Sequence, residues 1–394
     1  MRNNNAFGKS LNSKILNNEV KIPKPPIEIQ KQIIAECENI ESQSKNTKDL
    51  IALYKDLIQA ILAKCGISDL SAPLPSLREV GTTSWQSMTP DIIIATLLDL
   101  ITTLESKLEA LFCHTERSEV SQQNPESRDI SVSAKPQYDK ENIDCHDLTA
   151  SNLAMTEDSP SFASGKATDS PSITEGVRGW VESLTTLLKS LPTPPKNGWE
   201  RVKLGDYITS SGGNGFPKEY QGNKDSSQTP FIKVSDMNLK ENEREIIVSN
   251  NYVTQEVINK LSLKIFPKNT IVFPKVGMAI HTNKKRILNI PCIVDNNVMG
   301  VNILQNKIDS LNYKFLLIVF DFCIDLKDIA SNANPPSINN TNLNLLKIPL
   351  PPLHEQEKII SCIQSVESKI TALDSTLPTL ESKKSQILQK YLFD

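Results

Sequence analysis

Apolar residues recur every three or four positions along several stretches of the chain, and this spacing predicts helices. In two long stretches the intervals alternate between four and three residues, a period of 3.5 that is typical of coiled coils. The seam positions are Ile33, Cys37, Ile40, Ser44, Thr47, Ile51, Tyr54, Ile58 and Ile61 in the first stretch, and Ile359, Ile363, Val366, Ile370, Leu373, Leu377, Leu380, Ile387 and Tyr391 in the second. One such helix cannot bury its stripe alone, so we expect the two to pair antiparallel. Pro378 should kink the second helix or end its first part.

Two shorter apolar stripes predict a helix over residues 90–112 and another over about 177–191. The stretch between them, 113–176, holds 12 acidic and 5 basic residues and few large apolar ones. Such a composition cannot build a core and indicates a disordered linker.

From Trp199 to about Asn344 the pattern changes to short β-like runs separated by Gly, Asn and Pro. Helical pieces are expected at about 254–261 and 311–326. This mixture predicts a globular α+β domain with a modest excess of basic residues. The predicted strands are Phe231–Val234, Ile246–Val248, Ile271–Phe273, Ile293–Val294 and Val298–Ile303.

One sequence motif occurs twice, at a fixed offset of 326 residues. Lys21-Ile-Pro-Lys-Pro-Pro precedes the first long helix, and Lys347-Ile-Pro-Leu-Pro-Pro precedes the second. Gln30 and Gln356 also match at this offset. Pro-x-Pro-Pro forces an extended entry before each helix. Two unrelated proline-rich linkers are a poorer explanation than an internal repeat.

Composition narrows the classes of protein further. The 394 residues carry a formal net charge of −3, which excludes a histone-like polycation. The seven cysteines are scattered without a Cys-x-x-Cys pair, as in a reduced cytoplasmic protein, and no metal site is expected. No signal-peptide core is visible, and no apolar run reaches the ~20 residues of a membrane span.

The doubled Ile-Pro-x-Pro-Pro motif, each copy leading into a long helix, closely resembles the specificity (S) subunit of type I restriction–modification systems. Four further segments resemble it in the same order: Asn197–Asp206, Pro230–Asp236, Ile271–Gly277 and Asn334–Ile338. A complete S chain alternates two target-recognition domains with two helical regions. Here only about 20 residues precede the first motif, so the first recognition domain looks missing apart from its last segment, Phe7–Leu16.

The resemblance implies a non-catalytic, cytoplasmic DNA-binding subunit. Its recognition domain would read double-stranded DNA, and its helices would set the spacing and dock two methyltransferase (M) subunits. Those subunits would bring S-adenosylmethionine and methylate adenine, and a restriction (R) subunit would bring ATP and Mg. This chain would need no cofactor of its own. A second copy of the chain, or a separate first recognition domain, could complete the site.

The fold class expected is therefore α+β, with one target-recognition domain flanked by long antiparallel coiled-coil helices. The predicted segments are a domain remnant (1–20), helical region 1 (21–65), a further helical segment (66–112), the acidic linker (113–176), a short helix and linker (177–197), the recognition domain (198–346) and helical region 2 (347–394).

Lys, Arg, Asn and backbone amides are the groups that contact phosphates and bases. The predicted DNA-contacting residues are Lys233, Lys275, His281, Asn283, Lys284, Lys285 and Arg286, together with Gly213 and Asn214 in the flexible segment 210–216. An exposed turn with ordinary charges, or a bare turn at 210–216, is the alternative. Predicted partner-binding residues are Pro25, Pro26 and Gln30 in the first motif and Pro351, Pro352 and Gln356 in the second.

Two other functions stay open at this point. The chain could be a truncated coiled-coil remnant that specifies nothing, which the missing domain and the acidic linker favour. It could also be a stand-alone DNA-binding regulator, although the basic excess of the domain is small.

Overall fold

The computed structural model describes residues 25–68, 88–122 and 173–392. The predicted domain remnant at 1–20 and most of the acidic linker lie outside these residues. The chain divides into two compact units. Unit 1 holds Met1–Ala52, Ile101–Thr174 and Lys369–Asp394, and unit 2 holds Leu53–Leu100 and Glu175–Ser368.

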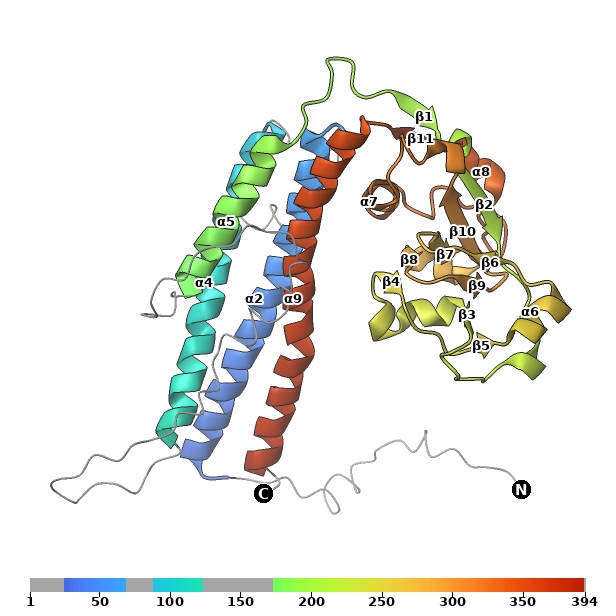
Figure 1. The fold of residues 1–394 in the computed structure, drawn as a ribbon. Helices are drawn as coiled ribbons and strands as arrows, with labels where there is room; N and C mark the ends of the chain where they lie inside the picture. Colours follow the sequence, from blue (N-terminus) through green and yellow to red (C-terminus); the bar gives the residue numbers. More distant parts are fainter. Residues whose placement is uncertain (1–24, 69–87, 123–172, 393–394) are drawn as a thin grey trace, which may run out of the picture. The chain divides into compact units, whose positions relative to one another are not determined.

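Four long helices lie where the apolar stripes predict them (Figure 1). They are α2 (Ile27–Lys64), α4 (Pro90–Gln122), α5 (Ile173–Ser190) and α9 (Leu353–Leu392). Helix α4 continues ten residues beyond the predicted end at 112, and α5 begins at 173. Both ends of the predicted linker are therefore helical, because helix formation propagates along residues such as Glu, Arg and Gln without needing a buried face.

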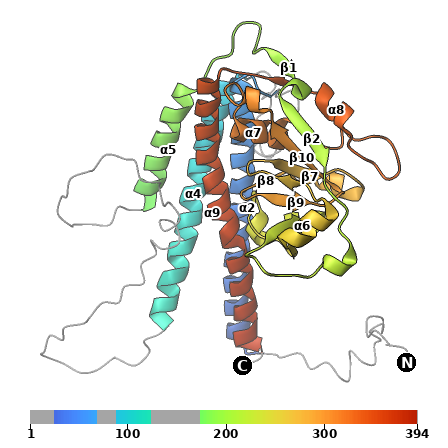
Figure 2. The ribbon, with the colours of Figure 1, turned by 45° about the vertical axis from the view of Figure 1, so that its right-hand side comes forward.

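The predicted antiparallel pairing of the first and last helices is confirmed in unit 1 (Figures 1 and 2). Near the start of α2, Gln32 donates to the Tyr391 hydroxyl at 2.9 Å, and that hydroxyl donates to Glu36 at 3.1 Å. Further along α2, Glu41 forms an ion pair with Lys384. Residue numbers rise along α2 as they fall along α9, so the two helices run in opposite directions.

Most seam positions are buried, although the seam is not uniform. In α2 the positions from Thr47 to Ile61 are at most 6% exposed, and in α9 Val366 and Leu380 are at most 2% exposed. Leu373 and Leu377 are only half-buried. The buried Thr47 hydroxyl donates to the Gln43 carbonyl at 2.8 Å, so its polar group is satisfied inside the helix.

Pro378 does not end the last helix, so that part of the prediction is wrong. Helix α9 runs through this exposed proline to Leu392. Proline removes one backbone donor and crowds one carbonyl. Beyond it, Lys384 and Tyr391 contact α2, and these tertiary contacts hold the rest of the helix.

Residues 200–349, the globular domain, belong to unit 2 and contain all the strands of the described residues. The strands are β1 (Arg201–Lys203), β2 (Ile208–Gly212), β3 (Thr229–Ile232), β4 (Glu245–Ile246), β5 (Tyr252–Val253), β6 (Ile265–Phe266), β7 (Ile271–Pro274), β8 (Arg286–Leu288), β9 (Cys292–Val294), β10 (Val298–Ile303) and β11 (Lys347–Pro349). Between them lie α6 (Gln255–Leu261), α7 (Tyr313–Cys323) and α8 (Asn340–Leu345). All five predicted strands and both helical pieces are present.

Three sheets organise this domain. A five-stranded sheet has the order β2-β10-β7-β8-β4, and a four-stranded sheet has the order β5-β3-β9-β6. The third sheet is the antiparallel pair β1-β11, in which Val202 lies opposite Ile348. Strand β11 is the second Ile-Pro motif, so this motif closes the domain by pairing its last strand with its first before α9 begins.

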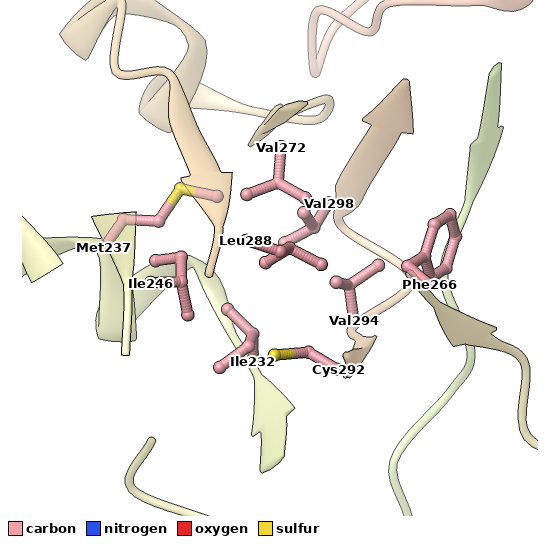
Figure 3. Close-up of a cluster of buried hydrophobic side chains, with 9 residues drawn as sticks. All are labelled: Ile232, Met237, Ile246, Phe266, Val272, Leu288, Cys292, Val294 and Val298. Atoms are coloured by element: carbon pink, nitrogen blue, oxygen red, sulfur yellow. The ribbon is translucent and has the colours of Figure 1, made fainter. Parts of the chain in front are cut away.

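The core of the domain joins side chains from both larger sheets (Figure 3). Ile232 and Val294 come from the four-stranded sheet, and Val272 and Val298 come from the five-stranded sheet. All are fully buried. Burial of such side chains contributes roughly 1.5–3 kcal/mol each before conformational entropy is subtracted. The core therefore fixes the ends of the strands, where the candidate DNA-contacting residues lie.

Candidate nucleic-acid interface

The glycine-rich segment, residues 211–221, starts in the last two residues of β2 and contains a short 3-10 turn at Lys218–Tyr220. Gly213 packs so tightly that a β-carbon there would lie 1.8 Å from the Val294 carbonyl oxygen. Asn214 donates its backbone N–H to the same carbonyl at 2.9 Å. Both predicted residues thus have a structural role in fixing this segment. Their contact with DNA stays a prediction.

Three lysines from three separate connecting segments of the chain converge on the glycine-rich segment. Lys264 donates its ammonium to the Ser211 hydroxyl at 2.7 Å and its backbone N–H to the Asn214 side chain at 2.8 Å. The Lys275 ammonium lies 2.5 Å from where a β-carbon of Gly212 would be. Lys233 donates to the Gln221 side chain at 2.6 Å. We call Lys233, Lys264 and Lys275 the lysine collar.

Two collar lysines are also held over aromatic rings. The Lys264 ammonium lies 4.8 Å from the centroid of Phe266, and the Lys233 ammonium lies 5.6 Å from that of Phe216. The Phe216 ring stacks on Phe231 at 3.7 Å, which anchors the segment to the core. The ring face attracts a cation, so the lysines are restrained without being neutralised.

Carboxylates near the collar have other partners. Among the described residues none of the three lysines forms an ion pair with an acidic side chain. The Asp295 carboxylate accepts from the backbone and side chain of Asn297. Glu219 and Glu256 lie near Lys260 instead, whose ammonium interacts with the Tyr220 hydroxyl. The collar is consequently an uncompensated positive surface.

The predicted basic cluster at 281–286 divides into exposed and buried members. His281 is exposed, and Lys284 is half-buried with its ammonium on the Asn238 side chain. Lys285 is only 3% exposed, and its ammonium donates to the Ile324 carbonyl and the Asn283 side chain, each at 2.8 Å. Lys285 therefore uses its donors inside the domain, and its contact with DNA stays a prediction.

Asn283 and Arg286 also hold the fold. The Asn283 side-chain oxygen accepts from the Leu326 backbone N–H at 2.9 Å, and its backbone adopts the left-handed conformation at φ 52°. Arg286 is the first residue of β8, and its guanidinium donates to the Asn242 and Lys285 carbonyls at 2.7 Å. These bonds give Arg286 a structural role at the start of β8. Its contact with DNA stays a prediction.

Burial makes the Lys285 ammonium easier to deprotonate. It lowers the pKa of this ammonium to about 8, although Asp321 and Asp325 oppose the shift. Asp321 lies on α7 and faces Arg244, whose guanidinium also approaches Glu367 of α9 at 2.5 Å. Burial raises the pKa of the Asp321 and Glu367 carboxyls, and Arg244 opposes both shifts. Arg244 thereby ties the globular domain to α9 within unit 2.

Gln356 provides the second attachment between the domain and α9. It is fully buried, donates to the Pro351 and Ser310 carbonyls at 2.8 Å, and accepts from the Asn312 backbone N–H at 2.9 Å. Pro351 is also buried, whereas Pro352 is exposed. Gln356 and Pro351 therefore form internal contacts of the chain, and their role in binding a partner protein stays a prediction.

The first motif repeats half of this arrangement. Gln30 donates its side-chain amide to the Pro25 carbonyl at 2.7 Å, as Gln356 does to Pro351. Backbone bonds from Gln30 to Pro26 and from Gln356 to Pro352 also match. Gln30 and Pro25 are half-buried and Pro26 is exposed, so their role in partner binding stays a prediction.

The part of the chain that the structure describes contains no cluster of three or more His, Cys, Asp or Glu side chains suited to a metal. Within the same residues, no helix combines the length and the apolar character that crossing a membrane requires.

Comparison with known proteins gives matches of one kind. Residues 196–381 match the family model described as "Type I restriction modification DNA specificity domain". A curated relative, the putative type I restriction enzyme MjaX specificity subunit of Methanocaldococcus jannaschii, is 35% identical over 97 residues. That match spans 23% of this chain and 23% of the relative.

Solved structures with matching parts include the HsdS subunit of Thermoanaerobacter tengcongensis, with 19% identity, a TM-score of 0.35 and coverage of 56% of this chain and 54% of that one. A structure concerned with assembly and conformational transition of the type I R-M system matches with 19% identity, a TM-score of 0.38 and coverage of 55% and 54%. This chain thus spans about half the length of these proteins. Residues 196–381, a little under half of this chain, are thus similar to the DNA specificity domain of type I restriction–modification systems.

Proposed function

We propose that this chain selects the DNA sequence at which a type I restriction–modification complex acts. Its globular domain contacts double-stranded DNA, and the chain catalyses no reaction itself. Methyltransferase subunits carrying S-adenosylmethionine methylate adenine at the selected site, and a restriction subunit adds ATP- and Mg-dependent restriction. Because its ligand is chromosomal or invading DNA, the proposal places the chain in the cytoplasm.

The convergence of three lysines on the glycine-rich segment is the observation that carries this proposal. These lysines lie inside the stretch that matches the DNA specificity domain, and none has a carboxylate partner among the described residues. Ammonium groups without counter-charges are the groups that attract DNA phosphates. A remnant with no ligand would have no reason to keep them uncompensated.

The long helices are proposed as the spacer between DNA contacts and as the dock for the methyltransferase subunits. Supporting this, Arg244 and Gln356 fasten the globular domain to α9, so the domain cannot turn freely on the helix. The exposed prolines of the two motifs, Pro26 and Pro352, lie beside the helix starts and are accessible to a partner.

We also propose that α2 carries a second docking surface for a domain of the same fold. At the offset of 326 residues, Gln30, Ile34 and Glu41 are the counterparts of Gln356, Ile360 and Glu367. In unit 2, Ile360 is 5% exposed and Glu367 contacts Arg244. In α2, Ile34 is 55% exposed and the side chain of Glu41 is 60% exposed. We name Gln30, Ile34 and Glu41 the α2 socket.

A second copy of this chain is a poor candidate for filling that socket. In its globular domain, Arg244 is already paired with Glu367. The backbone of Ser310 and Asn312 is already bonded to Gln356. Only three residues separate the end of β11 from α9, so the domain is held close to its own helix. The occupant we propose is therefore a separate domain of this fold, whether on another chain or ahead of residue 21 in a longer one.

Methylome sequencing tests the proposed function. The chain would be produced together with its cognate methyltransferase subunits in a host that lacks them, and adenine methylation would be mapped. We expect methylation at one sequence, absent when either component is omitted. An unchanged methylome with both components present would instead indicate a remnant. Sequence-specific DNA binding that persists without any effect of methyltransferase subunits would indicate a stand-alone regulator.

A further inference from the structure

Within the proposed DNA-binding function, the lysine collar and the turn at 278–284 have different surroundings. Collar ammoniums are restrained by a hydroxyl, an amide oxygen and aromatic faces, and they project around a segment rich in glycine. The turn instead exposes Met278 and His281, while Asn283 and Lys285 are used inside the domain. The two surfaces are therefore suited to different parts of a nucleic acid.

We propose that Lys233, Lys264 and Lys275 form a phosphate-binding site that holds the backbone of duplex DNA irrespective of its sequence. This inference rests on the proposed function and adds the part of the ligand that these three residues contact. Lysine is a compact point charge with rotatable donors, so it suits phosphate oxygens and discriminates poorly between bases.

Geometry explains how the collar keeps its charge available. Lys275 follows β7 and crosses above Gly212 of β2, which is possible only because this residue has no β-carbon. Lys264 reaches the neighbouring Ser211, and Lys233 reaches Gln221 at the far end of the same segment. All three partners are neutral. Each ammonium has three donors, so contact with one neutral oxygen leaves others for a phosphate.

Restraint of the lysines also favours binding. A free lysine side chain loses up to about 2 kcal/mol of rotamer entropy when it is immobilised. Because Lys264 and Lys233 are already held over Phe266 and Phe216, part of this cost is met during folding. Gly215 has no side chain, and nothing lies within 4 Å of its β-position. The tip of the segment is therefore accessible to a ligand.

Salt dependence of DNA binding tests the proposal. The full chain would be titrated into a labelled random-sequence duplex of about 30 base pairs over a range of salt concentrations. Each lysine–phosphate contact contributes a slope of about 0.9 in a plot of log affinity against log salt. We expect the triple variant Lys233→Gln, Lys264→Gln, Lys275→Gln to lose about 3 from this slope. Between about 50 and 200 mM salt its affinity should then fall about 40-fold less than that of the wild type.

Lys314→Gln is the matched control, because Lys314 is an exposed lysine at the start of α7, outside the collar. It should leave the slope unchanged, and circular dichroism should show all variants folded. If Lys264→Gln alone folds but the triple variant does not, a loss of about 1 from the slope replaces the larger effect.

Two results would overturn the proposal while leaving DNA binding intact. One is a wild-type slope in the folded collar variant. The other is a loss of about 1 from the slope in Lys314→Gln, as large as that of Lys264→Gln, which would mean that net charge alone matters. If the wild-type chain shows no salt-dependent binding to the duplex, the proposed function fails and the collar proposal fails with it.

Discussion

Gly213 lies at a position where no side chain fits. Its Cα faces the Val294 carbonyl oxygen, and a β-carbon would lie 1.8 Å from it. Gly215, two residues on, has nothing within 4 Å of its β-position. We expect Gly213→Ala to destabilise the globular domain by about 1–3 kcal/mol, because backbone must move to relieve the overlap. Gly215→Ala is the control and should be neutral. Denaturant unfolding measures both, and equal stabilities would show that the segment yields without cost.

Lys285 makes stability depend on pH in a defined direction. Its pKa is about 8 in the folded chain and 10.5 ordinarily. Between these values the unfolded chain binds a proton that the folded chain does not, so stability from this group rises with pH. Below about pH 8 Lys285 is protonated in both the folded and the unfolded chain, so its contribution to stability no longer changes with pH.

Substitution isolates that contribution. Lys285→Met should flatten the rise between pH 8 and 9.5, while Lys314→Met, at an exposed position, should leave it in place. Urea unfolding at several pH values is the measurement. A rise of the same size in Lys285→Met would assign it to another group.

Elements differ in how well the sequence predicts them. The helices α2 and α9 and strands such as β10 follow from periodicity, because apolar side chains must share a face to be buried. The two-residue strands β5 and β6 leave too short a pattern to find. Candidate residues were harder to judge. A run such as Lys284-Lys285-Arg286 looks exposed, but strand β8 begins at Arg286, and Lys285 just before it is buried.

Lys264 is a residue that sequence reasoning missed, because nothing in its local sequence marks it as a DNA-contacting candidate. It becomes one only when the chain brings it to Ser211, 53 residues away in sequence. The internal repeat, by contrast, is visible in the sequence, and the matching bonds of Gln30 and Gln356 confirm that it is structural.

The contact between the globular domain and α9 yields a prediction for a pair of elements. Arg244 approaches Glu367 at 2.5 Å, and their side chains are 41% and 13% exposed. A double-mutant cycle with Arg244→Met and Glu367→Met should give a coupling of about 1–2 kcal/mol, since the pair is partly screened by solvent. Lys358 and Glu355, at 3.0 Å within α9, form the control pair and should couple by about 0.5 kcal/mol or less. Equal coupling for both pairs would mean that Arg244 does not fasten the domain.

At the scale of the whole chain, the internal repeat relates contacts between the two long helices that are found in each unit. In unit 1, Tyr391 of α9 contacts Glu36 of α2. In unit 2, burial raises the pKa of Cys65 to about 12, and the neighbouring Cys362 thiol adds to the shift. Glu36 and Cys362 are 326 residues apart, and so are Cys65 and Tyr391. In each unit the internal repeat therefore brings matching positions of α2 and α9 near one another.

The internal repeat predicts where a second globular domain would bind. Residues 198–346 could be duplicated ahead of residue 21 in place of 1–20, because Lys21-Ile-Pro and Lys347-Ile-Pro are equivalent junctions. The added domain should then occupy the α2 socket as the original domain occupies α9. Because α2 and α9 run in opposite directions, two identical readers attached in this way should select an inverted repeat with a fixed gap. Methylome sequencing with cognate methyltransferase subunits would reveal such a site.

Ile34→Glu in the duplicated chain tests the α2 socket itself. Ile34 is 55% exposed, so the charge should be tolerated by the fold, but it would be buried by a docked domain, as Ile360 is in unit 2. We expect the inverted repeat to lose its fixed gap or to reduce to one half-site. Ile92→Glu, at a residue 51% exposed on α4, is the control and should keep the full site. A complete inverted repeat in both variants would show that the added domain is placed by something other than this socket, because a buried unpaired carboxylate is too costly to leave docking unchanged.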